Sequence, residues 1–449
     1  MNLRRVLWAS AVMSAIGAAF PQTASALDLR QAYDAAYQND AQIRASRAGA
    51  ESSRERLPQA KSQLLPNVSF SAGRNYNDLT SHGRNVLGQP STTESNYLSG
   101  NQTLSVRQPL YRPYQTAALR QAEAQVDDTN AALERDEQAL LVRVGEAYFE
   151  ALLAEDQLAL VRAQKTTYTA QLDAARKGLI AGSGTRTDVD EAQARLDMTV
   201  AQELEAQQNQ RFTRHRLEVL MGQSADDLAS LPKGPFVAQD PVPASVDAWM
   251  ERAEQNSPEL QSLRAQLEAA RQEVDKSKAG HLPTLDAVAQ WARTNSDSVY
   301  SVNSRYDNKV IGLQLSVPLY GGGYVNSTVR QAVAAQERAQ EALEATRRDL
   351  GVRVHREFRG VTEGVLRILA LEQAVRSAEL AVASNRRSFE GGMRTMIDVL
   401  NAEQQKTTAL RDLAQARYLY LVSRLRLQSL AGDDRLANIT SVNAWLLVP

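Results

Sequence analysis

The sequence contains an internal repeat in which five short landmarks occur twice, in the same order along the chain. The paired landmarks are QNDAQI at 38–43 with QNSPEL at 255–260, AKSQLLPNVSF at 60–70 with SKAGHLPTLDA at 277–287, SVRQPLY at 105–111 with LSVPLYGGG at 315–323, LRQAEAQ at 119–125 with VRQAVAAQ at 329–336, and AGSGTRTDVDEAQ at 181–193 with EGGMRTMIDVLNAE at 390–403. Chance similarity between two helix-rich halves accounts for one or two such matches but hardly for five. We therefore expect a duplicated structural unit.

Each copy of the repeat has the same order of expected elements: a helix, a β-hairpin, a long helix, a glycine turn and a return helix. The expected ranges are 28–62 and 246–279 for the first helix, 114–177 and 324–389 for the long helix, and 187–221 and 395–430 for the return helix. The two repeats occupy 27–230 and 246–432, with a connector containing Pro and Gly at 231–245 and a C-terminal tail at 433–449.

The two stretches between the first and the long helix alternate between apolar and polar residues, on either side of a polar loop (77–95 and 294–308). The apolar positions are Val68, Phe70, Ala72, Leu104, Val106 and Leu110 in the first repeat, and Leu285, Ala287, Ala289, Trp291, Ile311, Leu313 and Leu315 in the second. A period of two indicates strands with one apolar and one polar face. Strands of about ten residues fit a tilted membrane strand with its polar face toward a lumen. A soluble hairpin packed on a helix stays open as an alternative, and Asp286 near a strand start suits neither arrangement.

The long helices set the scale of the molecule. About 65 residues at 1.5 Å per residue span nearly 100 Å, which no single globular domain requires. Apolar residues such as Leu133, Leu140 and Val144 recur at helical spacing, as in a coiled-coil seam. The first helix and the return helix together match the long helix in length. We expect them to stack end to end along it, with the connector and the C-terminal residues at the break between them.

Four strands per chain are too few to close a barrel, because single-chain membrane barrels begin at about eight. Open sheet edges are not tolerated in lipid, so membrane-spanning strands would require several copies that share one barrel. Two copies give about eight strands with little room for a passage, whereas three give about twelve with room for a lumen. This consideration favours a trimer.

The N-terminus has the features of a signal peptide. The basic pair Arg4-Arg5 precedes the apolar residues 6–20, and Ala24-Ser25-Ala26 is a small-residue cleavage site. Cleavage after Ala26 would remove residues 1–26 and leave Leu27 first, with a retained anchor helix as the alternative. No other segment offers the roughly 18 apolar residues of a transmembrane helix. In a membrane, the mature chain would have to cross as strands.

Composition and motifs argue against an enzyme, a metal site or a nucleic-acid-binding protein. The 51 basic and 52 acidic side chains give a formal net charge of −1, so there is no general attraction to nucleic acid. The absence of cysteine excludes disulfides, thiolate metal sites and a lipid-modified N-terminal cysteine. The histidines lack metal-ligand spacing, and GSGT at 182–185 lacks the lysine of a phosphate loop. We expect no catalysis, no metal and no cofactor.

The motifs LLPNVSF and HLPTLD, SVRQPLY and SVPLYGGG, and GGMRTMIDVLNAE resemble the TolC-type outer-membrane factor family over essentially the whole mature chain. The resemblance implies a mainly α fold with a β-barrel part. It implies a homotrimer in the cell outer membrane, in which four strands per protomer form a twelve-stranded barrel that continues into a long periplasmic α-helical barrel.

The implied function is an exit duct, or channel, for type I protein secretion or tripartite efflux. The duct would open at its periplasmic tip when it docks with an inner-membrane transporter and a periplasmic adaptor. Its remaining partners would be outer-membrane lipid and an exported protein or small-molecule cargo.

The resemblance also assigns roles at the two glycine turns, which would form the periplasmic tip. The turn glycines are Gly182, Gly184, Gly391 and Gly392. Arg394 matches a family arginine that would pair with Thr187 and Asp188 as a gate latch. Phe389 stands where an aromatic residue with a hydroxyl can serve this latch, so one latch hydrogen bond should be missing here.

The implied pore constriction contains Asp398 and Asn401. These residues lie three apart and share a helix face, which becomes a ring around a symmetry axis. Like charges in a narrow ring attract cations and raise one another's pKa. Asn401 replaces the usual second acid, so the ring should be less acidic than in the family. As an alternative, Arg394 and Asp188 are solvated residues that cap helix starts, and the dipole favours an aspartate in a first helical turn.

A periplasmic adaptor, or another structural coiled-coil protein of an export complex, is the alternative function. Adaptors also have long helical hairpins, but they usually have one hairpin flanked by β-domains. Two equal halves with apolar strands favour the duct. The residues do not distinguish protein cargo from drugs.

Overall fold

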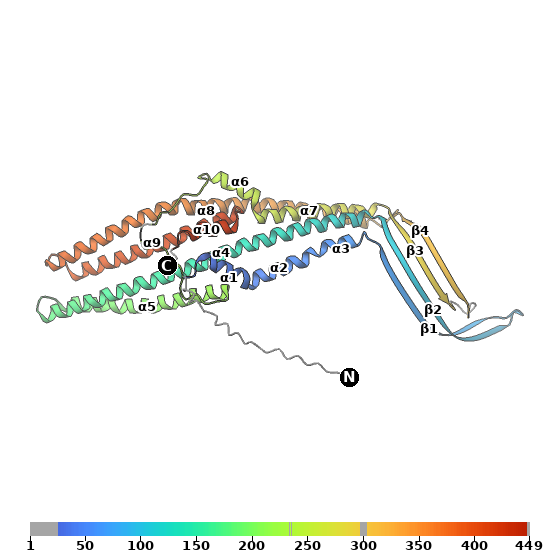
Figure 1. The fold of residues 1–449 in the computed structure, drawn as a ribbon, viewed down its shortest axis with the longest axis horizontal. Helices are drawn as coiled ribbons and strands as arrows, with labels where there is room; N and C mark the ends of the chain where they lie inside the picture. The colour runs from blue at the N-terminus through green and yellow to red at the C-terminus, as the bar shows by residue number, and fades with distance from the viewer. Residues whose placement is uncertain (1–25, 233, 235, 297–302, 447–449) are drawn as a thin grey trace, which may run out of the picture.

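The computed structural model describes residues 26–232, 234, 236–296 and 303–446. Figure 1 shows long helices lying side by side as a rod, with a four-stranded sheet inclined to them at one end. The expected signal peptide lies outside the described residues except for Ala26, which is buried. Among the helices of the described part of the chain, none is long and apolar enough to cross a membrane.

Two helices run the length of the rod. They are α4 (Pro113–Ile180, 68 residues) and α8 (Tyr324–Glu390, 67 residues), and at 1.5 Å per residue each is about 100 Å long. Their bounds agree within a few residues with the expected 114–177 and 324–389. Pro113 occupies the first turn of α4, where its missing N–H leaves no intrahelical bond unmade.

The helices that precede the hairpins are broken, so the prediction of one continuous helix at 28–62 and at 246–279 is wrong. The observed elements are α1 (Leu29–Asn39), α2 (Ala41–Arg54), α3 (Arg56–Ser62), α6 (Val246–Asn256), α7 (Pro258–Lys278) and the short 3-10 helix η1 (Ala279–His281). The main breaks fall at corresponding positions, Asp40 (φ −59°, ψ 121°) and Ser257 (φ −56°, ψ 122°). Asp40 ends one helix and caps the next, because its carboxylate accepts from Ile43 N at 2.8 Å.

The return helices are α5 (Arg186–Met221) and α9 (Met396–Leu430). A last helix, α10 (Arg435–Asn443), occupies part of the expected C-terminal tail. Arg435 attaches α10 to α4 through ion pairs with Glu134, at 3.1 Å, and with Glu137. Both partners lie about 300 residues away in the sequence, so the local pattern could not indicate this docking.

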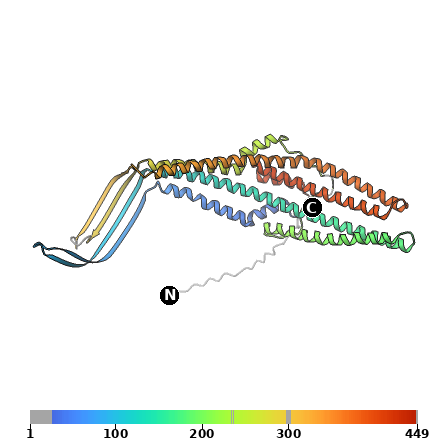
Figure 2. The same ribbon diagram turned by 180° about the vertical axis from the view of Figure 1, so that it is seen from behind.

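The shorter helices stack end to end along the long ones, as expected from their lengths. Helices α1, α2, α3 and α5 lie along α4, and α6, α7 and α9 lie along α8. Helix α4 also contacts α7 and α9, so the two repeats pack side by side (Figure 2). The connector returns to the middle of the rod, where Gln239 N donates to the Tyr420 hydroxyl at 2.9 Å.

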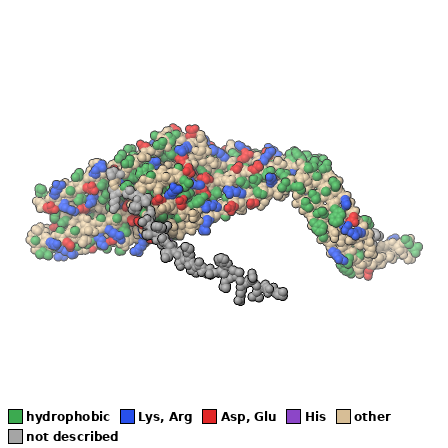
Figure 3. Space-filling model, in the orientation of Figure 1, with side chains coloured by type: hydrophobic (Ala, Val, Ile, Leu, Met, Phe, Trp, Pro, Cys, Tyr) green, Lys and Arg blue, Asp and Glu red, His purple; other side chains and the backbone are tan. Residues whose placement is uncertain are grey.

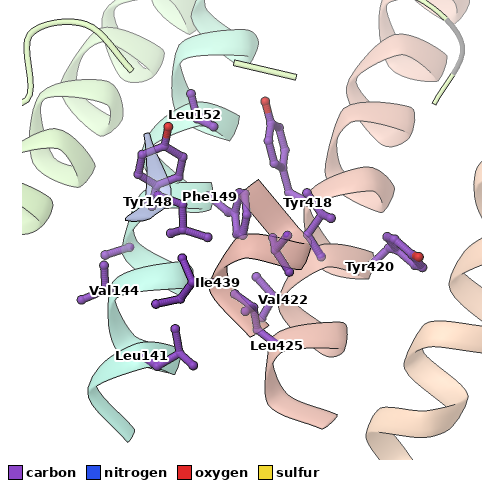
Figure 4. Packing of buried hydrophobic residues seen from close by; sticks show 14 of the residues in the cluster. Leu141, Val144, Tyr148, Phe149, Leu152, Tyr418, Tyr420, Val422, Leu425 and Ile439 are labelled. Carbon is purple, nitrogen blue, oxygen red and sulfur yellow. The ribbon is translucent and has the colours of Figure 1, made fainter. Parts of the chain in front are cut away.

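The hydrophobic core is richest near the middle of the rod, where helices of both repeats meet. Its largest buried side chains include Tyr148 and Phe149 from α4 and Tyr420 from α9 (Figure 4). The Tyr148 hydroxyl donates to the carbonyl oxygens of Leu27, at 2.8 Å, and Ala229, at 2.9 Å. This contact holds the start of the expected mature chain against the core.

The sheet is antiparallel, with strands in the order β1 (Asn67–Arg84), β2 (Pro90–Tyr111), β3 (Thr284–Asn295) and β4 (Arg305–Ser316). The prediction of ten-residue strands with a polar loop at 77–95 is wrong for the first hairpin, whose strands have 18 and 22 residues. Pairing of β2 with β3 stops at Gly100 and Asn295. Beyond this level β1 and β2 continue as a two-stranded ribbon (Figure 1). The ribbon has few apolar side chains, chiefly Tyr76, Leu79, Tyr97 and Leu98, so hydrophobic alternation does not reveal it.

The strand register divides the sheet into two faces. The apolar face carries Val68, Phe70, Leu104, Val106, Leu285, Ala287, Ala289, Trp291, Ile311, Leu313 and Leu315, and Figure 3 shows hydrophobic side chains gathered over the strands near the helices. The polar face carries Asn67, Ser69, Ser71, Thr103, Ser105, Arg107, Asp286, Gln290 and Gln314. Ile311 and Leu313 are 90% and 70% exposed, so this protomer alone leaves the apolar face uncovered.

Candidate functional site

The two glycine turns lie together at the end of the rod opposite the sheet (Figure 1). Gly182 and Gly392 occupy corresponding positions with φ of 74° and 71°, a conformation that favours glycine. In each turn an N–H reaches back to a carbonyl of the last helical turn, from Ser183 to Gly178 at 3.0 Å and from Met393 to Ser388 at 2.9 Å. These bonds satisfy carbonyl groups that a helix end leaves free.

Matching capping boxes begin the return helices. The Thr185 N–H donates to Asp188 Oδ2 at 2.9 Å, and the Asp188 N–H donates to Thr185 Oγ1 at 3.2 Å. Thr395 and Asp398 repeat this arrangement at 3.0 and 3.4 Å. Neither capping threonine is among the predicted site residues, although Thr-x-x-Asp before a helix is a recognisable capping signal. Thr187 lies exposed in the first turn of α5 and does not cap it.

Asp398 is the one carboxylate of the expected constriction, and its neighbours stabilise it as an anion. Backbone and hydroxyl hydrogen bonds from Thr395, and then the charge of Arg394, hold the pKa of this carboxyl below its usual range. Arg394 lies in the turn just before the Thr395 cap of α9, and its Nη1 is 3.6 Å from Asp398 Oδ1. Within the described protomer Arg394 is ion-paired with Asp398 and not with Asp188. The expected latch between Arg394 and Asp188 therefore stays a prediction about contacts between protomers.

Asn401 joins the two tip hairpins through a residue that the sequence analysis did not single out. Arg195 on α5 donates from Nη2 to Asn401 Oδ1 on α9 at 3.0 Å. The other edge of the same guanidinium faces Glu191, with Nε 3.3 Å from Oε1. The two partners are 206 positions apart in the sequence, so no motif could have paired them.

A small apolar cluster lies behind this hydrogen bond. Tyr168, Ala175, Met396 and Leu400 are buried together, with Val189, Leu196 and Phe389 packed against them. The cluster contains side chains of α4, α5, α8 and α9, so it connects the two hairpins of the tip. Phe389 contributes packing at this position, where the resemblance had suggested a residue of the latch.

A buried hydrogen-bond network continues from the cluster into α9. The Tyr168 hydroxyl accepts from Gln164 Nε2 at 2.9 Å and donates to Gln404 Oε1 at 3.2 Å. Burial raises the pKa of Tyr168, so the phenol stays neutral. Glu403, 4% exposed, lies between Arg386 at 2.9 Å and Lys406 at 3.0 Å. The two acidic residues near the turn therefore differ in their exposure to solvent, since Glu403 is buried whereas Asp398 is partly exposed.

This geometry suits a mechanical and electrostatic gate. Two rigid hairpins end in glycine turns, and a partly exposed carboxylate lies one turn from each tip. The hairpins are joined by the Arg195–Asn401 hydrogen bond, by hydrogen bonds from Gln164 and Tyr168 to Gln404, and by the small apolar cluster. No group of acidic and histidine side chains suited to a metal ion occurs in the part of the chain that the structure describes.

Known proteins share sequence with this chain over most of its length. The family described as outer membrane efflux protein matches residues 32–223 and 249–433. The proteases secretion protein PrtF of Dickeya chrysanthemi is 33% identical over 427 residues, which cover 94% of this chain and 92% of the relative. The alkaline protease secretion protein AprF of Pseudomonas aeruginosa is 35% identical over 415 residues, covering 92% and 85%.

The crystal structure of the outer membrane protein VceC from Vibrio cholerae has the same fold. It superposes with a TM-score of 0.78 at 19% identity, covering 90% of this chain and 96% of the other. The family match covers both repeats, and the structural match covers the helical rod and the sheet together.

Proposed function

Because this chain belongs to the outer membrane efflux protein family, we propose that it is the exit duct of a type I protein secretion system. It is an outer-membrane export channel with a large periplasmic helical part, built from an internal duplication. Membership in this family sets aside the alternative of a periplasmic adaptor. No enzymatic step is proposed for it.

The observation that carries the choice of cargo is the similarity to two protease secretion proteins, at 33% and 35% identity over more than nine tenths of this chain. Alignments that cover this much of the chain include residues of the tip, the rod and the strands. The proposed cargo is therefore a secreted protein, with a protease as the first candidate. A drug-efflux duct is the competing outcome of the test below.

The proposed assembly is a trimer that works with a periplasmic adaptor and an inner-membrane transporter. In the described strands β1 and β4 are the edges of the sheet, and an open edge is unstable in lipid. Pairing β1 of one copy with β4 of the next satisfies both edges. Three copies contribute twelve strands, with the exposed apolar face toward lipid and the polar face toward the lumen.

At the proposed gate, Asp398 from three protomers surrounds the passage and attracts cations. Asn401 adds no charge, and its amide is held by Arg195. Arg394 reaches Thr187 and Asp188 of a neighbouring hairpin in the closed trimer. Such a partly exposed ion pair is weak, so a docking partner can replace it. Arg394→Ala and Asp188→Ala should each raise single-channel conductance, and unchanged conductance in both would remove the latch.

The test of cargo uses a deletion of the gene in its own host, complemented by the wild-type chain. We expect one or a few proteins to disappear from the culture medium and to return on complementation, while drug susceptibility stays the same. Increased drug sensitivity with an unchanged set of secreted proteins would contradict the secretion role and indicate an efflux duct.

A further inference from the structure

The polar face of the sheet carries a single group of charges, at the junction with the helices. In the register-paired residues of β1 to β4, Arg107 and Asp286 are the charged side chains of this face. The other acidic and basic residues of these strands lie on the apolar face, near or beyond its outer edge: Arg74, Asp78, Arg84, Glu94, Arg293, Arg305, Asp307 and Lys309. Outward from Arg107 and Asp286, the register-paired residues of this face are therefore uncharged.

Asp286 is buried and paired with Arg112. The carboxylate is 4% exposed and accepts from Arg112 Nε at 2.8 Å and from Arg112 Nη2. Arg112 directly precedes α4 and follows a register shift between Pro109 and Tyr111 in β2. The pair thus ties β3 of the second repeat to the start of the long helix of the first. This tie explains an aspartate that strand alternation left unexplained.

Arg107 belongs to the same group but remains accessible. Its Nε lies 4.0 Å from Asp286 Oδ2, and its side chain is 58% exposed. It borders a hollow of about 760 Å³ whose lining includes Ser69, Ser105 and Gln290 of the polar face. Because Arg112 already forms two hydrogen bonds with the carboxylate, the charge of Arg107 is largely uncompensated.

We propose that Arg107 determines ion and cargo selectivity at the membrane end of the duct, where three copies form a ring of positive charge. The ring attracts anions, including carboxylate-bearing segments of a passing chain, and repels cations. This inference rests on the proposed trimer, which turns the polar face toward the lumen.

The ring acts independently of Asp398 at the tip. The 68 residues of α4 separate the two sites, a distance of about 100 Å at 1.5 Å per residue. At physiological salt, dissolved ions screen the interaction between two charges that lie more than about 8 Å apart. Each site therefore sets the ion preference of its own end of the passage, and the two can be changed separately.

The first test measures the reversal potential of single channels in a KCl gradient. Arg107→Gln should raise the permeability ratio of K⁺ to Cl⁻ by roughly two- to fivefold, because a positive charge is lost next to the ion path. Arg74→Gln is the matched control, since it removes the same charge from the apolar face of the neighbouring strand, and it should leave the ratio unchanged. A wild-type ratio in Arg107→Gln would overturn the proposal.

The second test uses the absence of native cysteine. Arg107→Cys, the sole thiol, is treated with methanethiosulfonate reagents, and mass spectrometry follows the labelling. A sulfonatoethyl group should raise the K⁺ preference further, and a trimethylammonioethyl group should return it toward wild type. Full labelling without these shifts would overturn the proposal, and so would failure of both reagents to reach the thiol from water.

Failure of this inference can be distinguished from failure of the proposed function. If the wild-type chain forms no channel in a bilayer, the duct itself is contradicted. If the channel forms and Asp398→Ala weakens block by a trivalent cation, while Arg107→Gln keeps the wild-type ratio, then only the junction ring is contradicted.

Discussion

Replacing Arg195 by alanine tests whether the hydrogen bond between the tip hairpins keeps the duct closed. Arg195 Nη2 donates to Asn401 Oδ1 at 3.0 Å, from α5 to α9. The Arg195 side chain is 33% exposed, so the bond is partly shielded from water. Its loss should let the two hairpins separate more readily while the capping boxes and the glycine turns remain.

The size of the effect follows from the geometry. A hydrogen bond to a charged group contributes about 1.5–3 kcal/mol, and partial exposure reduces this to about 0.5–1 kcal/mol. Three such bonds break together when a trimer opens, so about 1.5–3 kcal/mol favours the closed tip. Since about 1.4 kcal/mol corresponds to a factor of ten, Arg195→Ala should increase the open fraction roughly ten- to hundredfold.

The assay is the open probability of single channels in planar bilayers. Arg186→Ala is the matched control, because among the described residues the ion pair of Arg186 lies along its own helix, with Asp190 at 3.3 Å, and this variant should behave as wild type. Asn401→Ala should reproduce Arg195→Ala, and the double variant should add little to either. If Arg195→Ala keeps the wild-type open probability while Asn401→Ala raises it, the hydrogen bond is not the closing contact.

Four further predictions concern the gate, the core and the N-terminus. Asp398→Ala should weaken block by trivalent cations, measured as single-channel block, whereas Arg394→Ala should keep the block and raise conductance. Within the protomer, hydrogen bonds from Thr395 lower the pKa of Asp398. Thr395→Ala removes a hydroxyl donor and so raises this pKa, and as pH falls the block should disappear at a higher pH than in wild type. Phe236→Ala removes a side chain that is 4% exposed and should destabilise the protomer by about 3–5 kcal/mol, seen in urea unfolding of the detergent-solubilised protein. N-terminal sequencing of the membrane-extracted protein should begin at Leu27, and a start at Met1 would contradict cleavage.

The repeat, the rods and the turns could be predicted because each depends on residues close together in the sequence. Pro113 and the glycines after Met221 and Ala431 mark helix ends, and strand alternation identified the apolar face. The breaks at Asp40 and Ser257 were missed, because an extended backbone at one residue inside a helical pattern changes the apolar spacing very little. The ribbon of the first hairpin was missed because its strands carry too few apolar residues to form an alternating pattern.

The sequence by itself determined the lengths of the helices, the positions of the turns and which face of each strand is apolar, since these follow from local spacing and backbone preference. Only the tertiary structure decided which side chains meet. It placed Arg195 against Asn401 and Arg112 against Asp286, in both cases between different repeats, and it placed α10 of the C-terminal tail against α4. The physical reason is that the register between packed helices and paired strands is set by the summed packing of many side chains. A buried charge or amide then takes the partner that this register brings within about 3 Å.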